Sequence, residues 1–245
     1  MKNIQSALSV MRRAVENYGM ISRGDRIAVG VSGGKDSVVL LKLLAELRRF
    51  DAFSFDLEAI SIDPSFEDIG GGRFDRETIG AMCEELGVRL TVVKTKIARI
   101  VFEARGEERP CSLCARLRRG ALNDEAEKLG CSTLALGHHM DDAAETFMMN
   151  LMIGGKIGCF SPVTEYERIR LIRPLIYMRE REIEPLRRAL SLPVLQKICP
   201  VDGGTERERM KKTLISLDRE YRGLYDSIIG AMERGEVDGW KRGTE

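Results

Sequence analysis

The feature that most constrains this chain is the six-residue segment Ser32-Gly33-Gly34-Lys35-Asp36-Ser37, which lies between apolar runs at 27–31 and 38–41. A short β-branched apolar run is typical of a buried parallel strand, and apolar residues spaced by three and four are typical of a helix. The segment is therefore predicted to form a strand-to-helix turn. Its glycines let the backbone approach an anion, and the free amides and positive dipole end of the helix face that anion. The serine hydroxyls and the Lys35 ammonium add donors, so the segment predicts a phosphate site.

This loop differs from the two common phosphate-binding motifs. A Walker A loop has four residues between its glycines and a Ser or Thr after the lysine, and dinucleotide folds use GxGxxG. A glycine-rich turn with Ser32 as a helix cap is the simplest alternative, but the strand-loop-helix context favours phosphate. The loop resembles the PP-loop of the ATP pyrophosphatases, SGGxDS. In that family the loop holds the pyrophosphate of ATP while a substrate oxygen attacks the α-phosphate.

Composition sets broad limits on the protein class. The chain has 245 residues and a formal net charge of +1, so RNA binding must come from local basic patches rather than from the total charge. There is no run of eighteen apolar residues and no signal-peptide pattern at the start. We therefore expect a cytoplasmic protein with no membrane partner. Six cysteines in such a chain favour metal, redox or burial roles over a disulfide framework.

The order of predicted elements indicates an α/β fold with a doubly wound, mainly parallel sheet of about five strands. We expect an N-terminal amphipathic helix in 1–24, a PP-loop domain in 25–200 that carries the cysteine site, and a helical C-terminal extension in 201–245. Predicted strands cover 27–31, 55–63, 89–94 and 133–136. Predicted helices cover 3–18, 35 to about 50, 74–86, about 97–104, 111 to about 130 and 145–151. The triplet Gly70-Gly71-Gly72 is interpreted as a flexible or tightly turned loop.

The carboxyl ends of adjacent parallel strands line the ligand crevice of such a sheet. This places Ser61, Ile62 and Asp63, at the end of the second strand, beside the phosphate loop. In PP-loop enzymes, which this arrangement resembles, the second strand binds adenine through backbone groups. For Asp63, a turn-capping role before Pro64 is an equally good interpretation.

The fourth strand delivers the segment Gly137-His138-His139-Met140-Asp141-Asp142 to the same edge. One of the two aspartates is expected to act as helix N-cap. A carboxylate near ATP must bind a divalent cation or accept a proton, because a free anion would repel phosphate. In related families an aspartate of this segment assists catalysis or holds Mg²⁺, and we favour Asp142 over Asp141.

The second informative stretch is Cys111-Ser112-Leu113-Cys114, predicted to open a helix. Helix-end amides and nearby arginines lower thiol pKa values, and two cysteines three apart can share a metal or cluster. A lone CxxC is also compatible with a redox pair, half of a zinc site or no function. The third candidate is Cys199; three cysteines leave one position open, which His138 could close in a zinc site. Cys83, Cys131 and Cys159 are interpreted as structural.

Taken in order, the segments SGGKDS, CSLCARLRRG, GHHMDD and RPL resemble the tRNA 2-thiocytidine biosynthesis family of the PP-loop superfamily, over about residues 25–225. The resemblance implies that Cys111, Cys114 and Cys199 ligate a [4Fe-4S] cluster whose fourth iron holds a sulfide. The family often has a second cysteine shortly after the third one; here Val201-Asp202 stands instead. The implied cofactors are ATP, Mg²⁺ and the cluster, with tRNA as partner, a cysteine desulfurase or free sulfide as sulfur donor, and a homodimer as a possible assembly.

The implied reaction is adenylation of the C2 oxygen of a pyrimidine, followed by its replacement with sulfur. We assign catalytic roles to Cys111, Cys114, Cys199, Asp142 and Lys35. The absence of zinc-ribbon cysteines at the start, which the 2-thiouridine branch carries, favours an anticodon-loop cytidine. Three alternatives stay open: a 2-thiouridine synthetase, a persulfide route through the same cysteines, and a PP-loop ligase or nucleotide-binding module with structural zinc.

Basic side chains supply the candidates for contact with RNA phosphates: Arg116, Arg118, Arg119, Lys156, Arg207 and Lys211. A solvated basic face is an equally good interpretation of them. Arg173 lies in the apolar frame Leu171-Ile172-Arg173-Pro174-Leu175, and an arginine there could neutralise an α-phosphate transition state. The other arginines of 168–188, interleaved with glutamates, are interpreted as an ion-paired helix surface.

Overall fold

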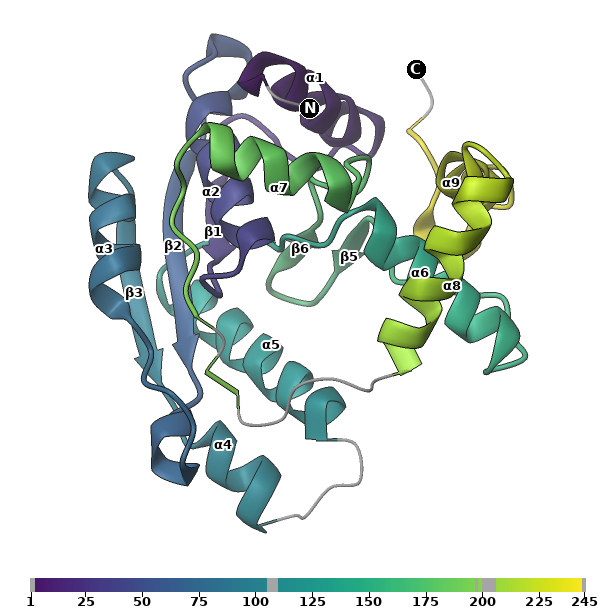
Figure 1. The fold of residues 1–245 in the computed structure, drawn as a ribbon. Helices are drawn as coiled ribbons and strands as arrows, with labels where there is room; N and C mark the ends of the chain where they lie inside the picture. The colour runs from purple at the N-terminus through teal and green to yellow at the C-terminus, as the bar shows by residue number, and fades with distance from the viewer. Residues whose placement is uncertain (1–2, 105–109, 197, 200–205, 244–245) are drawn as a thin grey trace.

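The computed structural model describes residues 3–104, 110–196, 198–199 and 206–243 (Figure 1). Within them, six strands form one sheet in the order β3-β2-β1-β4-β6-β5. The strands are β1 (Arg26–Gly30), β2 (Asp56–Asp63), β3 (Arg89–Lys94), β4 (Thr133–Ala135), β5 (Val163–Glu165) and β6 (Arg170–Ile172). All neighbouring pairs are parallel except the antiparallel pair β5–β6. The predicted α/β fold with a mainly parallel sheet is confirmed, and the sixth strand is the short antiparallel edge strand β5.

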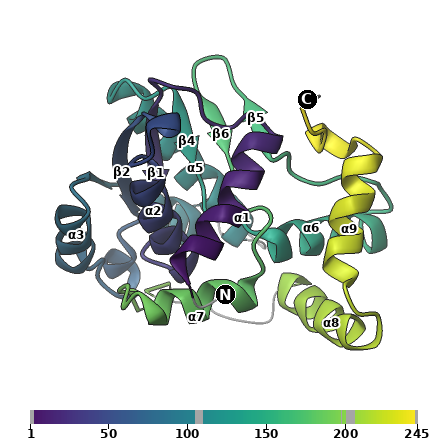
Figure 2. The ribbon, with the colours of Figure 1, turned by 90° about the horizontal axis from the view of Figure 1, so that it is seen from above.

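Helices cover both faces of this sheet (Figure 2). They are α1 (Ile4–Asn17), α2 (Lys35–Leu47), α3 (Arg76–Glu85), α4 (Ile97–Arg99), α5 (Pro110–Lys128), α6 (Met140–Met152), α7 (Glu180–Ala189), α8 (Glu206–Glu220) and α9 (Leu224–Arg234). The helix predicted near 97–104 is α4 followed by a π-helical turn at Ile100–Ala104. None of the helices in the described ranges has the length and apolar character needed to span a bilayer.

Two apolar clusters, one on each face, hold the sheet in place. Successive residues of a strand point to opposite faces, so Ile27 and Val29 join one cluster while Ala28 joins the other. The larger cluster packs α1, α2 and α7 against the sheet. The smaller one packs α4 and α5 against the opposite face. Helix α5, which carries the CxxC segment, is therefore fixed to the sheet by its apolar side.

The C-terminal segment packs against α6 and closes the larger cluster. Trp240 is completely buried, and its Nε1 donates to the backbone oxygen of Phe160 at 2.9 Å. Its ring meets that of Tyr18 edge to face, with centroids 6.1 Å apart. Helix α1 and the chain end thus meet in the same core. The division of the chain into three parts stays a prediction.

We expect Trp240→Ala to lower the free energy of unfolding by about 3–5 kcal/mol, because it removes a buried aromatic volume and leaves the Phe160 oxygen without its donor. Chemical denaturation followed by far-UV circular dichroism measures this. Tyr221→Ala is the matched control, since the Tyr221 side chain is 59% exposed. Equal stabilities of the two variants would contradict the role given to the chain end.

Candidate functional site

The predicted phosphate loop connects β1 to α2. Gly33 has φ of +79°, a backbone conformation that favours glycine. The Ser37 hydroxyl donates to the Gly34 oxygen at 2.9 Å and accepts from the Ser32 amide at 3.2 Å. The N-cap of α2 is Gly34, and no side chain caps the helix, so the alternative of Ser32 as a helix cap is wrong. The start of α2 thus keeps its donor character for a ligand.

A cavity of about 310 Å³ lies in front of this loop. Its walls are formed by Gly30, Val31, Ser32, Gly34, Asp36, Ser37, Ile60, Ile62, Ala115, Arg118, Arg119, Leu122, Leu136, Gly137, His138 and Asp142. The polar members come from the loop, from the segment after β4 and from α5. The apolar members come from β2, α5 and the ends of β1 and β4; of these, Ile62 was predicted from the sequence, whereas Ile60, Leu122 and Leu136 were missed. One side of the cavity therefore suits phosphates and the other suits a flat apolar ring.

The end of β2 contributes to this cavity through Ile62 only. Ser61 is fully buried, and its hydroxyl donates to the Val31 oxygen at 2.6 Å, tying β2 to β1. Asp63 accepts from the Ser65 amide at 2.8 Å, which is the turn-capping role. Neither side chain lines the cavity.

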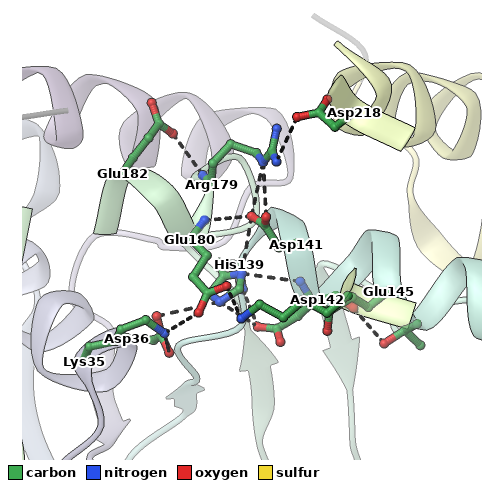
Figure 3. Close-up of polar contacts among 12 residues, drawn as sticks. Lys35, Asp36, His139, Asp141, Asp142, Glu145, Arg179, Glu180, Glu182 and Asp218 are labelled. Carbon is green, nitrogen blue, oxygen red and sulfur yellow. Dashed lines mark hydrogen bonds and ion pairs between the residues drawn. The ribbon is translucent and has the colours of Figure 1, made fainter. Parts of the chain in front are cut away.

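The segment after β4 separates the two neighbouring aspartates. The N-cap of α6 is His139: its Nδ1 accepts from the Asp142 amide at 3.4 Å, and Asp142 accepts from the His139 amide at 3.0 Å. The prediction that an aspartate is the N-cap is therefore wrong, because the histidine nitrogen takes that role. Asp142 still faces the cavity. Asp141 is buried and turns to α7, where it accepts from the Glu180 amide at 2.7 Å and pairs with Arg179 at 3.3 Å (Figure 3).

Glu180 joins the phosphate loop to α7 and α8, and sequence reasoning missed it. Its carboxylate lies 3.0 Å from the Lys35 Nζ, and Lys35 also pairs with Asp36 at 3.0 Å (Figure 3). The same carboxylate lies 2.5 Å from the Lys211 Nζ. Burial raises the pKa of Glu180, but Lys211 and Lys35 outweigh it and lower the pKa to about 2. Lys35 does not line the nucleotide-sized cavity; it lines a neighbouring hollow of about 570 Å³ at α7 and α8. The sequence around Glu180 is rich in ion pairs, so no local pattern distinguishes this glutamate from its neighbours. Only its position in the folded structure shows its role.

The predicted RNA-contacting residues fall into three groups. Arg118 and Arg119 line the cavity, and Arg116 and Lys156 are exposed. Lys211 pairs with Glu180, and Arg207 pairs with Asp142 at 3.2 Å.

Arg207 also covers Glu145, one turn further along α6. Its Nη1 lies 3.5 Å from the Glu145 carboxylate, and its Nη2 donates to Thr146 at 3.0 Å. Burial raises the pKa of Glu145 to about 7, although Arg207 opposes the shift. Helix α8 thus places a cation over the acidic side of the site.

His138 faces the cavity, whereas Arg173 lies behind it. The His138 ring stacks on Phe160 with centroids 5.1 Å apart, and the Arg173 guanidinium lies 4.8 Å from the same ring centroid. Arg173 donates to the Ser161 oxygen and to Thr164, so it fastens the β5 edge. Burial lowers the pKa of Arg173 to about 10. Burial, with the Arg173 charge, lowers the pKa of His138 to about 3, so its imidazole is neutral at pH 7.

The three predicted ligand cysteines are free thiols that lie close to one another. Cys111 is exposed at the start of α5, Cys114 is buried and Cys199 is half-buried. Burial raises the pKa of Cys114; the charge of Arg118 opposes this, and Cys199 and Cys111 raise it further. Cys111 and Cys199 therefore each lie near Cys114. In the described parts of the chain, no group of three or more His, Cys, Asp or Glu side chains is already placed to hold a metal ion.

Helix α5 brings the cysteines to the cavity. Cys114 directly precedes Ala115 and lies one turn before Arg118, and both of these line the cavity. The remaining cysteines lie elsewhere: Cys83 and Cys131 are buried, and burial raises the pKa of Cys159 to about 12. The CxxC pair therefore lies on the helix that forms one wall of the cavity.

Comparison with known proteins assigns this site to a class. The family model described as PP-loop domain matches residues 6–215. The U34-tRNA thiolase NcsA from Methanococcus maripaludis, solved with its [4Fe-4S] cluster, superposes with a TM-score of 0.75 and 26% identity, over 92% of this chain and 77% of that one. NH3-dependent NAD synthetase from Campylobacter jejuni, at 16% identity and a TM-score of 0.50, shares the fold. The fold and the loop are those of a PP-loop protein.

Curated relatives narrow the class. The tRNA-cytidine(32) 2-sulfurtransferase of Geobacter sulfurreducens is 40% identical over 239 residues, covering 94% of this chain and 89% of that protein. The enzyme of the same name from Geobacter metallireducens is 41% identical over 228 residues, covering 90% and 86%. The chain belongs to the tRNA-cytidine(32) 2-sulfurtransferase family of PP-loop enzymes.

The Glu180 ion pairs predict a pH dependence of stability. Because the pKa of Glu180 is depressed in the folded state, its ionised form contributes stability above the unfolded value of about 4.5. We expect Glu180→Gln to lower the free energy of unfolding by about 1–2 kcal/mol at pH 7, after allowance for solvent screening. The difference from the parent protein should shrink as the pH falls from about 4.5 toward 2.

Urea denaturation at several pH values measures this difference. Glu206→Gln is the control, because the Glu206 side chain is 53% exposed and, among the residues that the structure describes, pairs with its helix neighbour Arg209. A difference at pH 7 that persists unchanged down to the lowest pH would show that Glu180 acts by shape and not by charge.

Proposed function

We propose that this protein is an ATP-dependent tRNA sulfurtransferase that adenylates the C2 oxygen of cytidine 32 and replaces it with sulfur. One observation carries this proposal: helix α5 supplies both the cysteine pair and one wall of the cavity at the phosphate loop. A phosphate site explains activation, and adjacent thiols explain sulfur delivery. The choice of cytidine 32 and of tRNA rests on the names of the curated relatives.

In this proposal ATP occupies the cavity. Its phosphates meet the loop amides and the hydroxyls of Ser32 and Ser37, and the adenine lies among Ile60, Ile62, Leu122 and Leu136. Asp36 and Asp142 are the carboxylates that face the same space, and their oxygens suit Mg²⁺ bound together with phosphate. Arg118 and Arg119 complete the positive lining.

The chemistry follows from the poor leaving-group character of a ring carbonyl oxygen. The C2 oxygen attacks the α-phosphorus of ATP, its new O–P bond forms, and pyrophosphate leaves with the electrons of the broken P–O bond. The oxygen then departs as AMP when sulfur adds at C2. Arg118 and Arg119, on the cavity wall, neutralise charge that develops on the α-phosphate. Because His138 is neutral, it adds no further positive charge beside Asp36 and Asp142.

The donor set Cys111, Cys114 and Cys199 fits a [4Fe-4S] cluster, since three neighbouring thiols would leave one iron free of protein ligands. When bound, the cluster supplies the sulfur atom, which comes from a cysteine desulfurase or from free sulfide. The chain's own contribution is to hold these thiols, with the Arg118 charge favouring the thiolate of Cys114. The cluster in the structure of NcsA supports this assignment.

The decisive experiment is nucleoside mass spectrometry of tRNA incubated with anaerobically reconstituted protein, sulfide and Mg²⁺, with and without ATP. We expect ATP-dependent 2-thiocytidine, and its loss in Cys199→Ser together with loss of protein-bound iron. Cys83→Ser is the control, because Cys83 lies in the core away from the cavity. Formation of 2-thiouridine would move the protein to the other branch. Thiolation retained in Cys199→Ser would remove the cluster assignment, and thiolation by iron-free protein would favour a persulfide route.

The nucleotide site can be tested separately through Gly137. A Cβ at this position would lie 3.0 Å from the Asp36 carbonyl carbon and 3.1 Å from the Ser37 amide nitrogen, both backbone atoms. Gly137→Ala must therefore push the start of α2 away from the cavity. We expect ATP affinity, measured by isothermal titration calorimetry, to fall by about tenfold, or about 1.4 kcal/mol.

Gly80→Ala on α3 serves as control, since a Cβ there meets nothing within 4 Å. Unchanged ATP affinity in folded Gly137→Ala would place the nucleotide elsewhere.

A further inference from the structure

The segment that leads from α7 to Cys199 crosses the sheet edge, and only its last residue, Cys199, has a part in the proposed reaction. It consists of 194–196 and 198–199, and we call these residues the strap. Figure 1 shows it as the green trace that descends from α7 past the strands toward α5. The strap has no regular secondary structure, yet two backbone hydrogen bonds fix it.

The first docking point is the phosphate loop itself. The Leu195 amide donates to the Gly33 oxygen at 2.9 Å. The Leu195 side chain fills the space that a side chain at Gly33 would need, because a Cβ there would lie 2.5 Å from its Cγ. Leu195 is half-buried against the larger apolar cluster. The strap therefore packs against the loop at Gly33, and Leu195 is not among the residues that line the cavity.

The second docking point is the glycine triplet that follows β2. The Gly72 amide donates to the Ile198 oxygen at 3.0 Å. A Cβ on Gly71 would lie 2.6 Å from that same oxygen, and one on Gly72 would lie 2.9 Å from the Ile198 Cγ2 and 3.1 Å from its Cβ. Neither glycine has a positive φ; close approach of Ile198 accounts for Gly72, and close approach of Ile198 together with Phe66 accounts for Gly71. The triplet is thus a cradle for the residue that precedes Cys199.

We propose that the strap is a positioning device that ties the phosphate loop to the third cysteine, with Gly33 and Gly71–Gly72 as its two docking points. Ile198 and Cys199 both pack on the smaller apolar cluster, which also holds Cys114. Holding Ile198 therefore holds the Cys199 thiol beside Cys114. Leu195 and Gly72 act through their neighbours, and neither contacts a reacting atom. The link to sulfur transfer rests on the proposed function, whereas the link between loop and thiol does not.

The test uses the full-length protein, free of metal and reduced, and two strap variants: Gly72→Ala at the cradle and Leu195→Ala at the loop. The rate of alkylation of each cysteine by iodoacetamide is followed by peptide mass spectrometry. We expect the Cys199 rate to rise by about threefold or more in each variant, because a thiol released from its packing is more open to reagent. The rate of Cys111, which is already exposed, should stay unchanged and serves as internal reference.

Gly80→Ala is the matched control, since it adds the same methyl group in open space on α3. Near-UV circular dichroism establishes that each variant is folded. A second readout is iron bound after reconstitution, which should fall by about half or more in Gly72→Ala and Leu195→Ala. A third is ATP affinity, which should fall by about threefold or more in Leu195→Ala, because Leu195 supports the Gly33 backbone.

The outcomes separate the two ideas. If the alkylation rate of Cys199 in both folded strap variants equals that in Gly80→Ala, the strap proposal is wrong, whether or not the enzyme thiolates tRNA. A raised Cys199 rate with no thionucleoside from the parent protein would leave the strap standing and refute the proposed function.

Discussion

The parallel pairing of β1 with β4 is the constraint on which the rest of the site depends. Ile27 pairs with Thr133 and Val29 with Ala135, so the segments that follow β1 and β4 leave the sheet at the same edge. The phosphate loop then lies beside Gly137, whose missing side chain lets the backbone at the start of α2 come within contact distance. Because β2 pairs with β1 on its other side, Ile60 and Ile62 form the apolar wall. The pairing of the strands, and not any single loop, therefore sets the positions of these cavity residues.

Charge neutralisation is the second organising effect. Asp141, buried at the start of α6, is compensated by Arg179 and by the Glu180 amide, which fixes α7 against α6. Glu180 is compensated in turn by Lys35 and Lys211, which fixes α8. A buried ion pair costs much in desolvation, so such a network contributes mainly to a single arrangement of the helices. It also pairs one of the predicted RNA-contacting cations, Lys211, with Glu180.

The sequence allowed most of the architecture to be predicted, because the central strands β1, β2 and β4 are buried on both faces and are mostly apolar. The edge strand β5 was missed because its three residues carry no apolar pattern and are held by Arg173 from behind. The phosphate loop was predicted from local spacing and Asp142 from the resemblance to related families, whereas Glu180 and Leu195 were not predicted. Glu180 contacts Lys35 and Leu195 contacts Gly33, each more than a hundred positions away, and no local pattern records such a partner. The wrong prediction of an aspartate as N-cap has the same origin: Asp141 accepts a hydrogen bond from α7, and His139 is the N-cap of α6.

The separation of the cysteines along the chain has a physical consequence for how the site is assembled. Cys111 and Cys114 are presented by a helix that packing against the sheet makes rigid, so their spacing is set by one helical turn. Cys199 arrives on irregular chain, where each residue not held by contacts carries a cost in conformational entropy. Holding that thiol therefore requires contacts that the helix does not need. The backbone bonds to Gly33 and Gly72 supply them, and because one of these contacts is the phosphate loop, order at the nucleotide site and order at the third thiol are stabilised by the same segment.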